Sequence, residues 1–278
     1  MTYRIRKFAG TTVSHLVLAA LSLACLIPFI WMISTSLKTK AGMWEFPPRW
    51  IPSPPLWHNY RDAFTLAPFG TYITNTLTLE VLTIAGQVIS CTLIAYGFSR
   101  FRFRGRDTLF FLMLATMLIP EQVTMIPTFL FYSKLGWIDT YLPLVVPSFF
   151  GNAFYVFLMR QFLLTIPKDL DEAAKIDGAN EFTILWRVLV PILRPSLTII
   201  VVYTFTGVYN DFLSPLIYLN SPEKFTLAIG LANFVSSRST EWNLLMAAST
   251  VILLPLLLIY YLAQKNLIGG IASLGIKG

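Results

Sequence analysis

The stretch from Phe8 to Leu37 contains no Asp, Glu, Lys or Arg, and similar apolar runs recur along the chain. A helix needs about 20 apolar residues to cross a bilayer. Only 13% of the 278 residues are charged, and the mean hydropathy is +0.65. Because soluble domains carry about 25% charged residues, this chain cannot build a water-facing surface over its whole length. We therefore expect an all-α membrane protein that crosses the bilayer several times.

Six transmembrane helices are predicted from the apolar runs. They lie near 13–36, 71–97, 108–130, 141–163, 196–219 and 244–264. The chain then divides into an N-terminal part at 1–70, a core at 71–264 and a C-terminal tail at 265–278. Basic residues precede the first run, as in a signal peptide, but the run is longer than a signal core of 7–15 residues. It also lacks a small-x-small cleavage pattern, so a retained first span is expected.

The distribution of Lys and Arg predicts the orientation. With a cytoplasmic N-terminus, fourteen of these residues fall on the cytoplasmic face and seven on the other. This bias places both termini in the cytoplasm of a bacterial or archaeal plasma (inner) membrane. It also accounts for the net charge of +7 without a nucleic-acid partner. The basic turn at 100–106 is an orientation signal that contacts anionic membrane lipid. The Pro- and Trp-rich segment at 38–70 is then external.

The sequence contains few groups that could carry chemistry. Cys25 and Cys91 fit no metal or redox spacing and are interpreted as small core residues, while His15 and His58 lack ligand-like neighbours. No phosphate-binding loop, catalytic triad or metal-ligand cluster is visible. We therefore expect no cofactor, no metal and no enzymatic activity in this chain. If it drives transport, the energy enters through another subunit.

Three acidic residues within or near the spans leave a second function open. Glu80, Glu121 and Asp211 could serve as proton or sodium sites in an ion-coupled secondary carrier that acts without an ATPase. Structural polar contacts at an interface are the alternative interpretation. A membrane-embedded enzyme is set aside, because no nucleophile or metal set converges.

The cytoplasmic segment 167–191 is predicted to form a helix–turn–helix. Asp169, Asp171 and Glu172 crowd the positive end of a first helix, where its dipole favours carboxylates. Gly178 is the predicted helix stop. Asn180 is expected to cap a second helix at 181–188, which Pro191 ends.

One face of the first helix is narrow and made of small residues, with Leu170, Ala173, Ala174 and Asp177 at helical spacing. Small side chains let another backbone approach closely. The face is therefore suited to docking into a groove on a soluble partner, with Glu172 at its edge. A surface helix without a partner remains the alternative.

The spacing within this segment is more specific. Glu172-Ala173-Ala174, Gly178 and the closing Val188-x-Val190-Pro191 resemble the cytoplasmic signature of permeases from binding-protein-dependent ABC importers. The two Val residues replace Ile and Leu. The external segment 36–64, the stretch 209–219 and the tail 264–278 resemble the MalG-like carbohydrate permeases. Nearly the whole chain is covered.

The resemblance implies a type I ABC importer fold, described as MetI-like, and a set of partners. These are a second homologous permease subunit, two ATP-binding subunits, an extracytoplasmic sugar-binding protein and a sugar substrate. The residues expected to couple to the ATPase are Glu172, Ala173, Ala174, Asp177, Gly178 and Pro191. Tail residues Gly270, Gly275, Lys277 and Gly278 would reach between the ATPases, and the loop 220–241 would contact the binding protein. Tyr209, Asn210 and Asp211 could line the substrate pathway.

Overall fold

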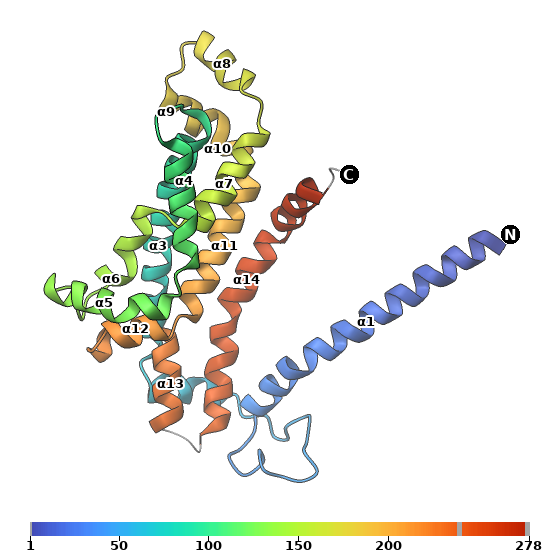
Figure 1. The fold of residues 1–278 in the computed structure, drawn as a ribbon. Helices are drawn as coiled ribbons and strands as arrows, with labels where there is room; N and C mark the ends of the chain where they lie inside the picture. The colour runs from blue at the N-terminus through green and yellow to red at the C-terminus, as the bar shows by residue number, and fades with distance from the viewer. Residues whose placement is uncertain (1, 238–240, 276–278) are drawn as a thin grey trace. The chain divides into compact units, whose positions relative to one another are not determined.

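The computed structural model describes the backbone of residues 2–237 and 241–275, and the side chains of residues 12–235 and 241–265. All the regular structure in these described parts is helical (Figure 1). The chain forms two compact units. The first comprises residues 1–68 and 231–254, and the second comprises residues 69–230 and 255–278.

The first unit contains the long helix α1 (Thr2–Ser36) and the short helix α2 (His58–Leu66). It also holds the end of α13 (Leu227–Ser237) and the beginning of α14 (Trp242–Gly275). The apolar window of α1 is fully exposed, as expected for a helix that faces lipid or another subunit. At its end, Asn59 of α2 donates to the carbonyls of Ser36 at 2.8 Å and Lys38 at 3.0 Å. These bonds satisfy carbonyls that a helix end leaves without partners.

The second unit is built on three helices that pack side by side (Figure 1). They are α3 (Phe69–Arg100), α7 (Ala153–Thr165) and α11 (Arg194–Asn210). Shorter elements surround them. These are α4 (Arg106–Ala115), η1 (Thr116–Leu118), α5 (Glu121–Lys134), α6 (Leu142–Val145), η2 (Val146–Phe150), α8 (Asp169–Ile176), α9 (Glu181–Thr183), η3 (Ile184–Leu189), α10 (Val190–Ile192), α12 (Leu213–Tyr218) and η4 (Pro222–Lys224).

One buried cluster joins α3, α7, η3 and α11. It is formed by Cys91, Ala95, Tyr96, Val156, Met159, Leu163, Ile166, Ile184, Leu185, Leu189, Leu193 and Ile200. Cys91 is therefore a core residue, as predicted. Cys25 is exposed on α1, so the core interpretation is wrong for that cysteine. Gly86 of α3 lets η2 pack closely, because a Cβ there would lie 2.1 Å from Ser148 Oγ.

Four helices in the described residues are long and apolar enough to cross a membrane, and six spans result when each of two bent pairs counts as one. The predicted third span at 108–130 is not continuous, since the chain bends by 99° between Leu118 and Glu121. Pro120 lies in this bend and has no N–H to continue the helical ladder. The predicted fifth span at 196–219 is also too long. Helix α11 ends at Asn210, and α12 begins separately at Leu213.

A clasp around Asp139 fixes the chain between α12 and α13. Its carboxylate accepts bonds from the backbone N–H groups of Asn220 at 3.0 Å and Ser221 at 2.9 Å, and from the Ser221 hydroxyl. Lys224 adds an ion pair at 2.9 Å. These donors, led by the Ser221 hydroxyl, hold the pKa of Asp139 well below its usual range. The clasp thus orders the beginning of the loop 220–241.

We expect Asp139→Asn to accelerate hydrogen exchange of the Asn220 and Ser221 amides at pH 7, because the charge-assisted bonds are lost. A depressed carboxyl pKa gives stability that is present above the ordinary value of about 3.9 and is lost as the pH falls towards the lower folded-state pKa. The protection of these two amides in the wild type should therefore be constant between about pH 5 and 8. It should fall to the level of the variant only in acid. Exchange corrected for its intrinsic pH dependence measures this. Glu223→Gln, in the same loop, is the matched control and should leave both amides unchanged.

Candidate functional site

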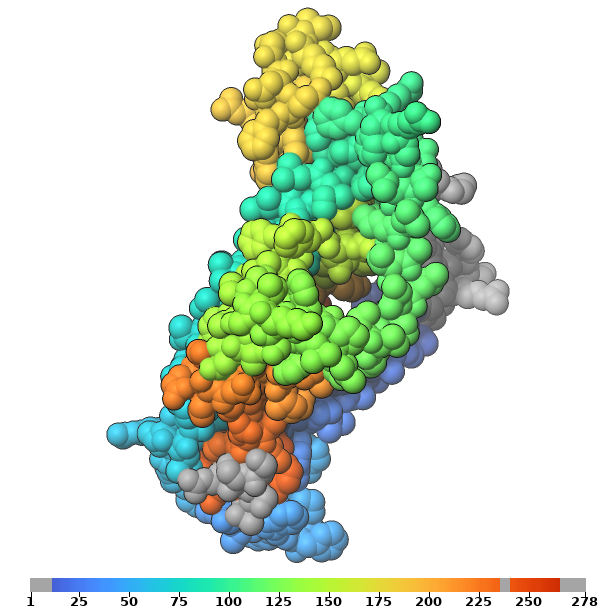
Figure 2. Space-filling model, turned by 60° about the vertical axis from the view of Figure 1, so that its left-hand side comes forward, coloured from blue at the N-terminus to red at the C-terminus, as the bar shows by residue number. Residues whose placement is uncertain are grey.

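The segment from α8 to α10 lies at one end of the three-helix bundle (Figure 1). In the space-filling view, α8 and its neighbours, coloured yellow, project from that end of the unit (Figure 2). The segment is connected to α7 through Ile166 and Pro167 and to α11 through Leu193. Its helices are short, so their position depends on side-chain contacts with the bundle rather than on their own helical stability.

The two ends of the turn between α8 and α9 are capped as the sequence predicts. Gly178 has φ +83°, the left-handed conformation that favours glycine. Its N–H donates to Lys175 O at 3.0 Å, and the Ala179 N–H donates to Ala174 O at 2.9 Å. This bonding pattern is a Schellman helix end. Asn180 then accepts from the Thr183 N–H at 2.8 Å and begins α9. The direction of the chain through the turn is therefore fixed.

A nearly buried ion pair holds the inner side of α8 to the end of α3. Arg100 Nε lies 2.6 Å from Asp171 Oδ2, with side chains 5% and 11% exposed. Arg100 also donates to Ile166 O at 3.2 Å. Burial raises the pKa of Asp171, and the positive charge of Arg100 opposes this. The sequence predicted only that the helix dipole favours Asp171, whereas the structure shows that this carboxylate also anchors α8 to α3.

A second, more exposed set of bonds joins α8, α9 and α3. Glu181 accepts from Tyr96 Oη at 2.6 Å and pairs with Lys175 Nζ at 2.6 Å. Lys175 lies on α8, Glu181 on α9 and Tyr96 on α3. Both helices of the segment are thus linked to one transmembrane helix. A displacement of α8 must move the end of α3 or break these bonds.

The second helix is longer than predicted. It runs from Glu181 to Ile192 through the π-helical turn η3, so Pro191 does not end it. In η3 the Val190 N–H donates to Leu185 O, five residues back. The wider turn explains the tolerance of Pro191, because a proline ring otherwise clashes with the carbonyl four residues earlier. Ile184, Leu185 and Leu189 enter the bundle core, and Ala174 packs against it.

The outer side of the segment carries the residues predicted to dock. Glu172, Ala173, Asp177, Gly178 and Pro191 are all exposed, while Ala174 is half-buried.

Three apolar side chains lie beside them, of which Leu170 was predicted to lie on the docking face and the other two were not predicted from the sequence. Ile176 is 87% exposed, Phe182 66% and Leu170 41%. Ile176 lies four residues after Glu172, so helical spacing could have placed both on one face. Exposed apolar side chains on a segment that is otherwise polar indicate a protein-binding surface.

The predicted tail contacts are only partly within the described structure. Helix α14 includes Gly270 and Gly275. Lys277 and Gly278 lie outside the described residues.

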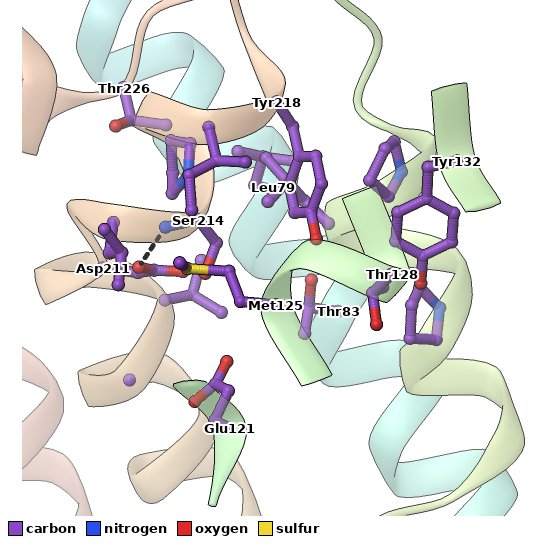
Figure 3. A pocket seen from close by; sticks show the side chains of 18 of the residues that line it. Leu79, Thr83, Glu121, Met125, Thr128, Tyr132, Asp211, Ser214, Tyr218 and Thr226 are labelled. Atoms are coloured by element: carbon purple, nitrogen blue, oxygen red, sulfur yellow. Dashed lines mark hydrogen bonds between the residues drawn. The ribbon is translucent and has the colours of Figure 1, made fainter. Parts of the chain in front are cut away.

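A cavity of about 540 Å³ lies between α3, α5, α6, the end of α11 and α12 (Figure 3). Two carboxylates, Glu121 and Asp211, line it together with hydroxyl and aromatic side chains. Asp211 Oδ1 accepts from the Ser214 N–H at 3.1 Å, which fixes the carboxylate at the beginning of α12. Figure 3 shows Tyr132 and Tyr218 on the opposite side of the cavity from Asp211. The residues could hydrogen-bond a polyhydroxylated ligand and stack against it.

The other acidic and pathway candidates lie elsewhere. Tyr209 is buried and stacks on Phe205 at 5.3 Å between ring centroids, and Asn210 donates to Thr206 O at 2.8 Å within its own helix. Neither lines the cavity. Glu80 is 1% exposed and also does not line it. Within the described parts of the chain, no group of three or more His, Cys, Asp or Glu could hold a metal ion.

The described residues thus contain four candidate membrane spans, or six if each bent pair is one span, and a short helical segment at one end of the second unit. Residues 88–272 match the family described as binding-protein-dependent transport system inner membrane component. The match covers more than half of the chain, so this protein belongs to that family. It is accordingly a multi-pass inner-membrane transport protein.

Individual relatives agree with this placement. The galactooligosaccharides transport system permease protein GanQ of Bacillus subtilis is 29% identical, over 99% of this chain and 98% of that protein. The arabinooligosaccharides transport system permease protein AraQ of the same organism is 34% identical, over 73% and 72%. A chain of a solved bacterial ABC transporter that imports the acidic polysaccharide alginate superposes with a TM-score of 0.80 at 26% identity, covering 91% of this chain and 95% of that one.

A double-mutant cycle on Arg100 and Asp171 tests the anchor of α8. Either Arg100→Gln or Asp171→Asn alone leaves one nearly buried charge unpaired, and should cost about 3–5 kcal/mol. The double variant should recover most of that loss, because two neutral amides replace the pair. Thermal unfolding and hydrogen exchange of residues 169–178 measure both effects.

The control for this cycle is Lys175→Gln. It breaks an ion pair whose partners are 52% and 42% exposed, so the cost should be below about 1 kcal/mol. Single variants at Arg100 and Asp171 that exchange like the control would contradict the anchoring role.

Proposed function

We propose that the protein is the permease subunit of an ATP-driven sugar importer. It forms half of the transmembrane pathway, beside a second homologous permease. Two ATP-binding subunits on separate chains sit on its cytoplasmic side, and an extracytoplasmic sugar-binding protein delivers the substrate. Family membership and the similarity to oligosaccharide permeases support this proposal. Both termini are cytoplasmic, as the Lys and Arg bias indicates.

The observation that carries the coupling mechanism is the two-sided character of α8. Its outer side exposes Glu172, Ala173 and Ile176, whereas Asp171 on its inner side is fixed to α3. A partner that grips the outer side therefore acts on the bundle through Arg100. Closure of the ATPase dimer pulls on α8, and the helices of the second unit rotate. The pore then opens to the outside of the membrane. The ATPase can shift this equilibrium only because it binds the two states differently.

The remaining contacts of the assembly are proposed from the resemblance of the sequence to the permease family. Asp177 and Gly178 form the exposed turn after α8, which completes the ATPase contact. Pro191 lies at the other end of the segment 167–191. The tail, with Gly270, Gly275, Lys277 and Gly278, extends between the ATPases. The loop 220–241, whose beginning the Asp139 clasp orders, meets the binding protein.

The cavity with Asp211 and Glu121 is the candidate stretch of the sugar pathway. Carboxylates accept hydrogen bonds from neighbouring sugar hydroxyls, and the half-buried ring of Tyr132, which stacks on Trp137, adds an aromatic surface at the cavity. Of the three residues predicted for the pathway, Asp211 has the position for this role.

An ion-coupled carrier is the second candidate function. Glu121 and Asp211 in one cavity favour it, since paired acids in a membrane protein often bind protons or sodium. The two functions differ in energy source. Uptake into proteoliposomes that requires ATP and the ATPase supports the importer, and uptake driven by an ion gradient without them refutes it.

We expect Glu172→Lys to release the ATPase subunits, because it reverses a charge on the outer face of α8 next to Ala173. Affinity purification of the tagged complex in mild detergent should recover the ATPase with wild type but not with the variant. Glu172→Gln, which only neutralises the charge, should show an intermediate loss. Glu45→Lys makes the same charge reversal on the segment 38–70 and should retain the ATPase. Full recovery of the ATPase with Glu172→Lys would refute the assignment.

Asp211→Asn should reduce sugar uptake without loss of assembly. The amide oxygen can still accept from the Ser214 N–H, so the beginning of α12 is preserved, while the negative charge in the cavity disappears. One weakened hydrogen bond to a sugar corresponds to a roughly tenfold rise in the transport KM. Asn210→Ala, on the same helix end but outside the cavity, should leave the KM near wild type.

A further inference from the structure

A second cavity, of about 630 Å³, lies at the end of the bundle where α3 meets α4. Residues from five segments line it: the end of α3, the turn after it, the first turn of α4, the last turns of α7, and the residue before α8. Four of them are basic, namely Arg102, Arg106, Arg160 and Lys168. Asp107 is the only carboxylate among the lining residues. This recess is distinct from the cavity that holds Asp211. The only role considered so far for its residues is the general contact of the turn 100–106 with anionic membrane lipid.

Two of the four cations are fixed by their own contacts. Arg160 Nε donates to Phe98 O at 3.3 Å, and its guanidinium lies 4.2 Å from the centre of the Phe110 ring. Arg106 Nε pairs with Asp107 Oδ1 at 2.9 Å. Arg106 and Arg160 nevertheless repel each other. The recess therefore brings fixed positive charges together with a single carboxylate to balance them.

The other two cations are available to a ligand. The side chains of Arg102 and Lys168 are exposed and form no hydrogen bond or ion pair with the described residues, although Lys168 feels the charge of Asp171. Helix α4 also begins at the recess, with Gly105 in a left-handed conformation and no side-chain cap. The positive end of its dipole adds to the field. An anion at this place would relieve the repulsion.

The surface beside the recess indicates which kind of anion. Phe103 and Leu164 line the recess and are exposed, and α4 continues into the span with exposed Leu109 and Leu112. These apolar side chains face hydrocarbon if α4 crosses the membrane. A ligand with a phosphate at the cytoplasmic surface and acyl chains below would satisfy both parts.

We propose that this recess is a binding site for the phosphate group of an anionic phospholipid. Arg102 and Lys168 contact the phosphate, and the acyl chains lie along α4. Arg106 and Arg160 add to the positive electrostatic potential at the phosphate. Basic pockets between transmembrane helices on the cytoplasmic side bind such headgroups. Because Lys168 directly precedes α8, lipid bound here touches the segment that leads to the ion pair of Asp171.

The test compares two double variants that lose the same charge, each in the full complex. Arg102→Gln with Lys168→Gln removes the two phosphate contacts. Arg104→Gln with Arg194→Gln removes two exposed cytoplasmic charges outside the recess. Complexes are reconstituted in nanodiscs of phosphatidylglycerol and phosphatidylcholine. Retained lipid is then counted by native mass spectrometry after transfer to detergent.

We expect wild type and the control variant to retain phosphatidylglycerol, and the recess variant to bind it roughly 30-fold more weakly. Equal retention by both variants would overturn the site. A second measurement titrates the complex that retains phosphatidylglycerol with inorganic phosphate. Displacement of phosphatidylglycerol by millimolar phosphate would overturn the lipid assignment in favour of a soluble phosphate site. Thermal unfolding and the recovered partner subunits must match between the variants, so that misfolding is not read as lost binding.

Discussion

The structure depends on one buried core that is shared by the transmembrane bundle and the segment beyond it. Ile184, Leu185 and Leu189 belong to the segment, yet they pack with Cys91 of α3 and Met159 of α7. Burying such side chains stabilises by about 1.5–3 kcal/mol each, more than an exposed salt bridge provides. The segment is therefore part of the bundle and cannot move independently of it.

Polar contacts add direction to that apolar attachment. The pair of Arg100 and Asp171 fixes the inner side of α8, and Glu181 links α8 and α9 to Tyr96. Hydrophobic contacts are non-directional, whereas short charge-assisted bonds set position and angle. The combination suits a lever, since force applied to the exposed side reaches α3 through few intermediates. In the proposed mechanism the exposed outer residues bind the ATPase, and the inner residues transmit its movement to α3.

The two polar cavities have opposite charge and lie among different elements. The cavity with Glu121 and Asp211 is acidic and is lined by hydroxyl and aromatic groups. The recess with Arg102 and Lys168 is basic and borders exposed apolar side chains. A neutral polyhydroxylated ligand fits the first, and an anionic amphiphile fits the second. The two proposals therefore assign separate cavities to the sugar and to the lipid.

The sequence by itself determined the class, the helical apolar runs that give four to six candidate spans, and the capped turn at Gly178 and Asn180. These features depend on local chemistry: apolar run length, the conformational freedom of glycine, and a side chain that bonds its own backbone. The exposure of Glu172 on α8 also followed from a local pattern.

Only the tertiary structure decided where α3 holds α8. Arg100 and Asp171 are far apart in sequence, so no periodic pattern of residues predicts that they pair. The tertiary structure also decided that α11 ends at Asn210, and that Pro191 lies inside a helix behind a π-helical turn. In these places packing against the bundle outweighs local propensity, which an apolar run cannot reveal.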